Sequence, residues 1–185
     1  KLRETALKAL DETTFYPSKG KERLRSMIET RPDWCVSRQR VWGVPLPIFI
    51  NKNSKEILID DEVSETIAKI YEKEGSDCWF SDNPQKFLGK KYNSEGFEKL
   101  SDIVEVWFDS GSTHSFVLEK RKDLKWPASM YLEGSDQHRG WFQSSLLESC
   151  GTRGRAPFES ILSHGFVVDG KGLKMSKSLG NVLAP

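Results

Sequence analysis

The sequence contains few cysteines, no long apolar run and no excess of charge of one sign. Its three cysteines, Cys35, Cys78 and Cys150, form no C-x-x-C pair, which argues against a disulfide framework and a thiolate zinc site. No apolar run approaches the ~18 residues of a membrane span. The 28 basic and 27 acidic residues leave a net charge of +1, so a polyanionic partner is neither required nor excluded. We therefore expect a soluble protein of the reducing cytoplasm, without membrane association.

The common phosphate-binding motifs are missing as well. The chain has no G-x-x-x-x-G-K-S/T loop, and no G-x-G-x-x-G follows a predicted strand. His114 and His138 have no metal-ligand spacing to each other or to a cysteine, so we expect no metal site in this chain. Any phosphate binding must therefore be built in a different way.

The length of 185 residues is sufficient for one well-buried domain, or for a domain with a small insertion. Three zones are distinguishable: residues 1–50, a polar and less distinctive middle at 51–100, and residues 101–185. The middle zone has the character of an inserted α+β subdomain. Because the chain starts at Lys1 and stops shortly after a lysine-rich loop, we expect it to be a piece of a longer protein.

Apolar periodicity predicts the elements of the first two zones. Helical spacing over residues 2–10 is followed by a short strand at 13–17 and by a second helical stripe over 24–28. In the middle zone, residues 47–59 are typical of a hairpin, and the apolar spacing over 63–71 predicts a helix closed by Gly75. The polar stretch 81–99 is expected to be a loop.

The third zone alternates predicted strands and helices. The apolar run at 129–134 breaks at Gly134, and a helix is expected over 135–150 with Ser135 or Asp136 as its N-cap. A second apolar run, at 159–170, leads into the lysine-rich loop. This order favours an α/β layer with a parallel sheet, in which ligands bind at the carboxyl ends of the strands.

The residues around the first of these strand ends are candidates for a binding site. Glu133 is expected at the carboxyl end of the strand, with Asp136 and Gln137 in the first helical turn, where free backbone N–H groups attract hydroxyl or phosphate oxygens. Gln137 and Trp141 are four residues apart and share a helix face. A structural interpretation, with Asp136 as a cap and Trp141 in the core, stays open.

The loop GKGLKMSKSLGN at 170–181 carries Lys174 and Lys177 between glycines. Compact ammonium groups suit phosphate oxygens, and the glycines would let the loop move onto a ligand with several negative charges. The alternative is a solvated, mobile turn without a ligand.

KMSKS at 174–178 and four further blocks carry a family resemblance. The blocks are WCVSRQRVWGVP, VWFDSGSTH, YLEGSDQHRGWF and LSHGFVVDGKGLKMSKSLGN. In this order they resemble the class I aminoacyl-tRNA synthetases, and RQRVWGVPLP and FDSGSTH are closer to the isoleucyl members than to the valyl or leucyl ones. The resemblance implies the second half of a Rossmann-like α/β catalytic domain, with the small inserted subdomain at 51–100.

The resemblance also implies a reaction: a monomeric ligase would activate isoleucine with ATP and Mg²⁺ to isoleucyl-adenylate and transfer it to tRNA(Ile). Lys177, assisted by Lys174, would stabilise the charge that develops as pyrophosphate leaves. The other implied contacts are Met175, Ser176 and His164 with ATP; Glu133, Gly134, Asp136 and Gln137 with the adenylate; and Trp42 and Trp141 with the aliphatic side chain. The alternatives are a structural histidine at 164 and ordinary core tryptophans.

Several features of the family pattern are missing or lack a role. The H-x-G-H nucleotide signature is absent, as are the editing insertion and the anticodon-binding region, so the chain alone is expected to form no adenylate at a useful rate. Trp107, Asp109 and Ser110 match a family block but have no evident role beyond packing and loop closure. Two other interpretations stay open: a valyl or other class I synthetase, and a non-catalytic RNA-binding domain.

Overall fold

The computed structural model describes residues 1–183, and the chain divides into two compact units. The first unit combines residues 1–33 with the chain from Ser110 onward, and the second is Trp34–Asp109. The insertion expected at 51–100 falls within the second unit. Among the described residues, no helix is both long enough and apolar enough to cross a bilayer.

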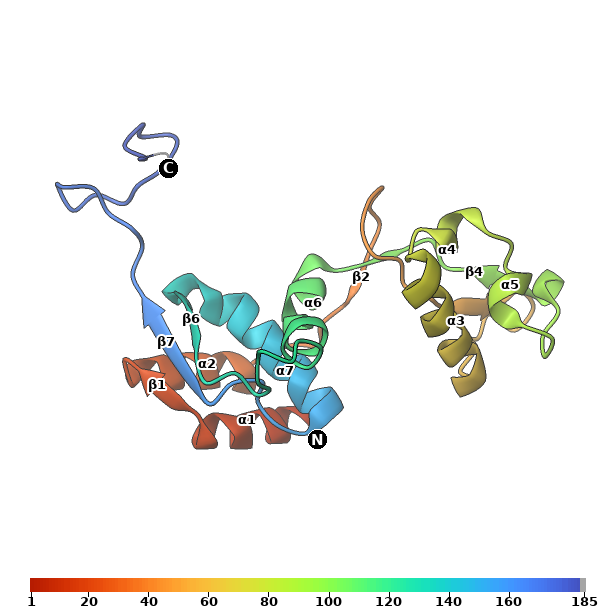
Figure 1. The fold of residues 1–185 in the computed structure, drawn as a ribbon, viewed down its shortest axis with the longest axis horizontal. Helices are drawn as coiled ribbons and strands as arrows, with labels where there is room; N and C mark the ends of the chain where they lie inside the picture. Colours follow the sequence, from red (N-terminus) through yellow and green to blue (C-terminus); the bar gives the residue numbers. More distant parts are fainter. Residues whose placement is uncertain (184–185) are drawn as a thin grey trace. The chain divides into compact units, whose positions relative to one another are not determined.

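A three-stranded parallel sheet forms the centre of the first unit (Figure 1). Its strands are β1 (Thr14–Tyr16), β7 (Ser160–His164) and β6 (Tyr131–Gly134), in the order β1-β7-β6. Ile161 of β7 is in register with Phe15 on one side and with Tyr131 on the other. The prediction of an α/β layer with a parallel sheet is confirmed.

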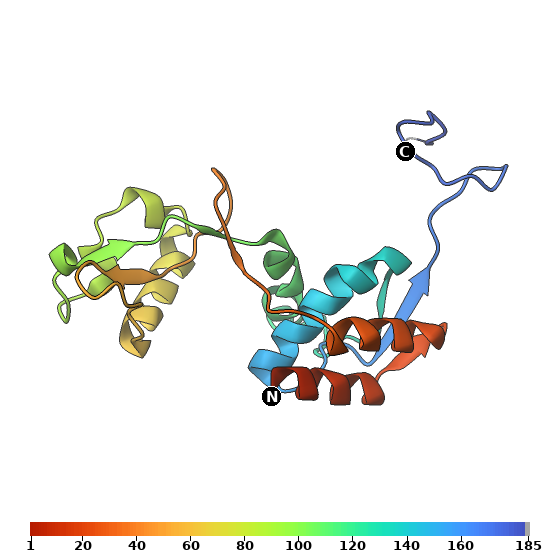
Figure 2. The ribbon, with the colours of Figure 1, turned by 180° about the vertical axis from the view of Figure 1, so that it is seen from behind.

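One face of this sheet is covered and the other is largely open. Phe15, Ile161 and Tyr131 are buried, whereas Tyr16 and Leu132 in the next register row are more than half exposed. The buried row joins a core with apolar residues of three helices: α1 (Leu2–Glu12), α2 (Lys19–Glu29) and α7 (Trp141–Arg153). Figure 2 shows α1 and α2 side by side, as the periodicity of the first zone predicts.

Three shorter helices occur along the chain: α6 (Val106–Gly111), the π-helix η2 (His114–Leu118) and the 3₁₀ helix η3 (Ser135–Arg139). The boundary between the two units falls within α6, after Asp109. The single helix predicted over 135–150 is wrong: η3 and α7 are separated at Gly140, whose φ of −120° and ψ of −115° lie outside the helical region. Neither Ser135 nor Asp136 is an N-cap, because the cap of η3 is Gly134 and that of α7 is Gly140.

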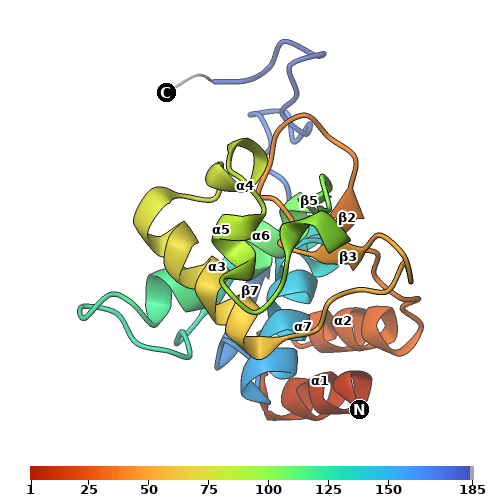
Figure 3. The same cartoon turned by 90° about the vertical axis from the view of Figure 1, so that its right-hand side faces the viewer.

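The second unit contains two antiparallel strand pairs and several helices (Figure 3). β2 (Ser37–Arg38) pairs with β5 (Ile103–Val104), and β3 (Phe49–Asn51) pairs with β4 (Phe97–Lys99). The helices are α3 (Asp61–Glu74), α4 (Cys78–Ser81), α5 (Gln85–Leu88) and the 3₁₀ helix η1 (Ser94–Gly96). Trp79 is fully buried in its core, in contact with Phe49 and Phe87.

The ends of α3 follow from its sequence. Asp60 Oδ1 accepts hydrogen bonds from the backbone N–H groups of Glu62 at 2.9 Å and Val63 at 3.2 Å, which caps the amino end. Gly75 has a φ of 84°, a conformation that favours glycine, and its N–H donates to the Tyr71 carbonyl at the carboxyl end. The helix predicted over 63–71 and closed by Gly75 is confirmed.

The expected hairpin over 47–59 is present: Ile50 and Ile57 form a bridge, flanked by hydrogen bonds of 2.9 Å from the Asn51 N–H to the Glu56 carbonyl and from the Leu58 N–H to the Phe49 carbonyl. β3 also pairs along its length with β4, a partner that the sequence does not predict. β4, α5 and η1 all lie within residues 81–99, so the prediction of a loop there is wrong. Phe97 packs edge-on against Tyr92, so this distant segment contributes to the core, whereas Ile57 is more than half exposed. Core packing thus adds a distant strand partner to the local hairpin.

The central position of β7 generates a stability prediction. Ile161→Ala should lower the free energy of unfolding of the chain by about 2–5 kcal/mol, because Ile161 is fully buried and its truncation leaves a cavity. Leu132→Ala on the neighbouring strand β6 is the control, since Leu132 is 56% exposed, and it should change stability by less than about 0.5 kcal/mol. Urea denaturation measures both variants, and equal losses would contradict the assignment of the covered face.

Candidate functional site

The carboxyl ends of β6 and β7 bring three predicted site residues together. Gly134 is in register with His164, the last residue of β7. A Cβ atom at Gly134 would lie 2.5 Å from Asp136 Oδ1 and 3.9 Å from His164 Cε1. Only glycine leaves room for this carboxylate, so Gly134, Asp136 and His164 converge at the strand ends. His164 is exposed, and its Nδ1 lies 2.7 Å from the Gly165 carbonyl oxygen.

Two acidic side chains and one amide side chain lie at or just after this strand end, in exposed or half-buried positions. Glu133 is exposed, and its Oε2 accepts from the Gly134 N–H at 3.0 Å. Asp136 Oδ2 accepts from Gln137 Nε2 at 3.3 Å, and Gln137 Oε1 accepts from the Trp141 N–H at 3.0 Å. Gln137 therefore satisfies a free donor at the start of α7, and the two carboxylates keep acceptor capacity for hydroxyl or ammonium groups.

Trp141 is half-buried, so one part of the indole packs in the protein and another part reaches the surface. Its ring stacks on Tyr131 with a centroid distance of 4.0 Å and an interplanar angle of 3°. Its Nε1–H donates to the Ser110 carbonyl at 3.0 Å. A half-buried tryptophan with a fixed ring plane can form the wall of an apolar pocket.

His138 has a role in this site that sequence reasoning missed. The side chain is 1% exposed, and its Nδ1 lies 2.8 Å from the Ser135 carbonyl oxygen. Its ring meets Phe142 edge-on, and it packs against Gly20 in the first turn of α2. Burial lowers the pKa of His138, so the imidazole is neutral at physiological pH. His138 thus links η3 to two helices, and the sequence offers no signal that separates it from a surface histidine.

The lysine-rich loop leaves the carboxyl end of β7 (Figure 1). Asp169 closes its base: Oδ1 accepts from the N–H groups of Lys171 at 2.9 Å and Leu173 at 3.0 Å, and Oδ2 accepts from Asn181 Nδ2 at 2.9 Å. Asn181 Oδ1 in turn accepts from the Ser176 N–H at 3.0 Å. Asp169 and Asn181 thus join two points of the loop that are 12 residues apart. We call this pair the loop clamp.

The two lysines of the loop have different surroundings. Lys174 Nζ lies 3.6 Å from the centroid of the Phe166 ring, a cation–π contact. Lys177 is exposed and belongs to the turn in which the Leu179 N–H donates to the Ser176 carbonyl at 3.2 Å. Met175 is held by its N–H, which donates to the Val167 carbonyl at 3.0 Å. Lys177 therefore presents its ammonium group to solvent.

Trp42 belongs to the second unit, where it is 90% exposed. It lines a shallow pocket with Arg38, Arg40, Glu105 and Asp109, among other residues. Burial, and then the neighbouring Glu105 charge, raises the pKa of Asp109. The other predicted site residues all belong to the first unit.

One group of potential metal ligands, Glu74, Cys78 and Asp82, occurs in the described part of the chain, with ligand atoms within 4.8 Å of one another. Lys86 Nζ already lies between the carboxylates, 2.5 Å from Glu74 and 2.7 Å from Asp82. Burial raises the pKa of Cys78, so its sulfur stays a thiol, and it donates to the Gly75 carbonyl at 3.0 Å. This chemistry fits an internal ion-pair network better than a metal site.

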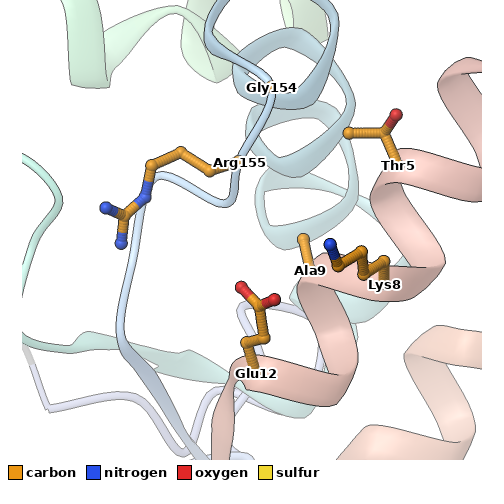
Figure 4. A pocket seen from close by; sticks show the side chains of 6 residues that line it. All are labelled: Thr5, Lys8, Ala9, Glu12, Gly154 and Arg155. Atoms are coloured by element: carbon orange, nitrogen blue, oxygen red, sulfur yellow. The ribbon is translucent and has the colours of Figure 1, made fainter.

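A pocket near the start of the chain has no evident part in the candidate site (Figure 4). Its lining residues are Thr5, Lys8, Ala9, Glu12, Gly154 and Arg155. Glu12 and Arg155 precede β1 and β7, so this pocket lies toward the amino ends of the strands. Ligands of parallel α/β sheets bind at the opposite ends.

The chain matches the family model of class I tRNA synthetases (I, L, M and V) over residues 1–185. It therefore belongs to the class I tRNA synthetase family, and the resemblance carried by the motif blocks is confirmed. Over 184 residues it is 82% identical to the isoleucine–tRNA ligase of Pelagibacter ubique and 59% identical to that of Zymomonas mobilis, in each case covering 100% of this chain and 20% of the relative. The corresponding Caldicellulosiruptor saccharolyticus enzyme is 58% identical over 188 aligned positions, covering 99% of this chain and 20% of that relative. The chain thus spans about a fifth of the length of these curated relatives.

A solved structure supports the fold. The match is the ternary complex of LeuRS, tRNA and LeuAMS from Agrobacterium radiobacter K84, with a TM-score of 0.54 and 24% sequence identity. The alignment covers 83% of this chain and 22% of that chain. At this identity the match establishes a shared fold alone.

The loop clamp generates a prediction about pH. The Asn181 side chain, then the Leu173 and Lys171 N–H groups, lower the pKa of Asp169. Because the pKa of Asp169 is lowered, its ionised carboxylate stabilises the clamped loop at pH values above the ordinary aspartate range. This stabilisation is lost as the pH falls through the lowered pKa and the carboxylate becomes protonated. Asn181→Ala should raise the pKa of Asp169 toward its ordinary value, as measured by NMR titration of the carboxyl carbons. Asp123, which pairs with Arg121, is the internal control. An unchanged Asp169 pKa would show that the clamp does not form.

Proposed function

We propose that this chain is part of an isoleucine–tRNA ligase, which activates isoleucine with ATP and transfers it to tRNA(Ile). The observation that carries the proposal is the position of Glu133, Asp136 and His164 at the carboxyl ends of parallel strands, with the KMSKS loop continuing directly from β7. Identities of 58–82% to enzymes named isoleucine–tRNA ligase support this substrate over valine or leucine.

The strand-end residues would bind the adenylate. Glu133 and Asp136 carry carboxylates that accept hydrogen bonds from an ammonium group or from ribose hydroxyls. Gln137 offers an amide, and Gly134 lets the ligand approach the backbone. His164, on the neighbouring strand end, would contact the nucleotide. These assignments stay predictions, supported by the proximity of Gly134, Asp136 and His164.

The lysines would act on the phosphates. A carboxylate oxygen of isoleucine attacks the α-phosphorus of ATP, the bond from that phosphorus to the bridging oxygen breaks, and pyrophosphate leaves with the electron pair. Lys177, with Ser176 and Met175 beside it, would hold the polyphosphate and stabilise the developing charge. Lys174 would assist after leaving the Phe166 ring, and the loop clamp would hold the loop base during this movement. Mg²⁺ would arrive on the ATP phosphates, whose oxygens suit this cation.

Trp141 and Trp42 are each predicted to contact the isoleucine side chain. Isoleucine has no polar handle on its side chain, so recognition rests on apolar contact, worth about 1.5–3 kcal/mol for full burial. Trp141 offers a ring of fixed plane, whereas Trp42 is 90% exposed and its contact with the substrate is supported by the motif resemblance alone. We also propose that the enzyme acts in the cytoplasm, where its three free cysteines would stay reduced.

Loss of the second loop lysine should reduce adenylate formation strongly. The test uses a Pelagibacter chimera, the full-length Pelagibacter ubique enzyme in which this chain replaces its matching segment. Lys177→Ala should lower isoleucine-dependent ATP–pyrophosphate exchange by about 10²–10³-fold, because one donor to the transition-state charge is removed. Lys171→Ala, a lysine of the same exposed loop, is the matched control and should retain exchange. Equal effects of both substitutions would refute the assignment of Lys177.

The 185-residue chain by itself should show no ATP–pyrophosphate exchange above background. The reason is that it has no H-x-G-H motif to share the charge on the phosphates with the lysine loop. The same assay with the Pelagibacter chimera provides the positive control. Clear exchange by the chain alone would mean that the strand-end edge and the loop suffice for activation.

A further inference from the structure

We propose that Gly111 and Tyr131 are positioning residues that fix the orientation of the Trp141 indole, and thereby set discrimination between branched aliphatic side chains. The inference rests on the proposed function, because it deepens the role of Trp141 as a pocket wall. It also gives a purpose to the block FDSGSTH, for which the sequence alone suggested only packing and loop closure.

Tyr131 defines the plane of the indole. Its ring lies parallel to that of Trp141 at 4.0 Å, within a contact distance that leaves no space between the rings. Tyr131 is itself immobilised: it is buried, its ring contacts Phe158 at 4.8 Å, and its hydroxyl shares a hydrogen bond of 3.1 Å with Ser145 Oγ. Tyr131 thus covers one face of the half-buried indole as a fixed platform, and we assign the ligand to the opposite face.

The backbone of the FDSGSTH block fixes the remaining freedom of the indole. Stacking alone permits rotation and sliding within the ring plane, whereas the hydrogen bond from Trp141 Nε1–H to the Ser110 carbonyl at 3.0 Å selects one orientation. The same carbonyl accepts from Thr113 Oγ1 at 2.5 Å, so Ser110 is held in position as an acceptor. The indole is thus constrained by a ring face and by a directional bond.

Gly111 allows the Ser110 carbonyl to come this close to α7. A Cβ atom at Gly111 would lie 2.1 Å from Glu148 Oε1, 2.8 Å from Glu148 Cδ and 3.0 Å from the Ser144 carbonyl carbon. The Glu148 carboxylate would have to move, and the tight contact with the Ser144 backbone would be relieved only by a shift of a few tenths of an ångström. Trp141, Ser144 and Glu148 follow the three- and four-residue spacing of one helix face. A side chain at position 111 would therefore displace the Glu148 side chain and shift the Ser110 carbonyl slightly away from the helix face that carries Trp141.

A displaced indole would weaken recognition of the isoleucine side chain more than recognition of ATP. A difference of one methylene in an apolar pocket is worth about 10- to 200-fold in general, a range that includes the isoleucine–valine pair itself. Such small differences depend on close contact with the pocket wall. Residues that tilt or shift the wall therefore act on specificity without touching the substrate.

The test is Gly111→Ala in the Pelagibacter chimera, with Gly151→Ala as the matched control. Gly151 is also a helical glycine, on α7, but its Cβ would meet only Leu2 Cδ1 at 3.6 Å, an ordinary contact. Gly111→Ala should raise KM for isoleucine by about 10- to 100-fold and lower the isoleucine-to-valine ratio of kcat/KM, with KM for ATP within about twofold. Gly151→Ala should change none of these. An unchanged KM for isoleucine, or equal rises for isoleucine and ATP, would overturn the inference.

Two further measurements separate positioning from general damage. Adding Glu148→Ala to Gly111→Ala removes both contacts with the Glu148 side chain, leaves the one with the Ser144 backbone, and should restore part of the affinity for isoleucine. Hydrogen exchange of the Trp141 indole N–H, followed by NMR, should accelerate in Gly111→Ala and in Tyr131→Leu but not in Gly151→Ala. Unchanged exchange in Gly111→Ala contradicts the inference directly. If the unmodified chimera fails to activate isoleucine, the proposed function fails, whereas the exchange measurement still decides whether Gly111 positions Trp141.

Discussion

The pairing of β7 with β1 on one side and β6 on the other is the constraint on which the rest of the first unit depends. Ile161 is the centre of this pairing, since it is fully buried and in register with both Phe15 and Tyr131. Parallel pairing directs the carboxyl ends of the strands to one edge of the sheet. Because a shift of one residue would reverse the faces of every side chain, this buried row also fixes which residues end at that edge.

Two parts of the candidate site follow from the sheet in different ways. Glu133 lies within β6 and His164 is the last residue of β7, so the register of the two strands determines their positions. The KMSKS loop leaves the same edge, but its shape depends on the hydrogen bonds between Asp169 and Asn181. The part of the site at the strand ends would recognise the adenylate. The exposed loop, held at its base by the loop clamp, would supply positive charge to the phosphates, which must enter and leave during each turnover.

The elements that depend on local spacing, and the family, which depends on short motifs, are predictable from the sequence. Helical periodicity over residues 2–10 and the Gly75 stop correspond to elements of the structure, and the motif blocks identify the family. Contacts between distant segments were not predictable. Nothing local distinguishes β4 from a loop, because its pairing with β3 and the burial around Phe97 depend on residues far along the chain. The bond from Trp141 to Ser110 likewise joins residues 31 positions apart. The break at Gly140 falls at a residue type of low helix propensity, but apolar periodicity over 135–150 favoured a single helix.

The most direct test of the account is calorimetric titration of the Pelagibacter chimera with non-hydrolysable isoleucyl- and valyl-adenylate analogues. Glu133→Ala is compared with Glu159→Ala, an exposed carboxylate that pairs with Lys125 just before the amino end of β7. We expect tighter binding of the isoleucyl analogue, weakened about 10- to 150-fold by Glu133→Ala, as for loss of a hydrogen bond to a charged group. Glu159→Ala should leave the affinity unchanged. Equal affinities of the two glutamate variants would contradict the claim that the carboxyl edge of the sheet is the binding site.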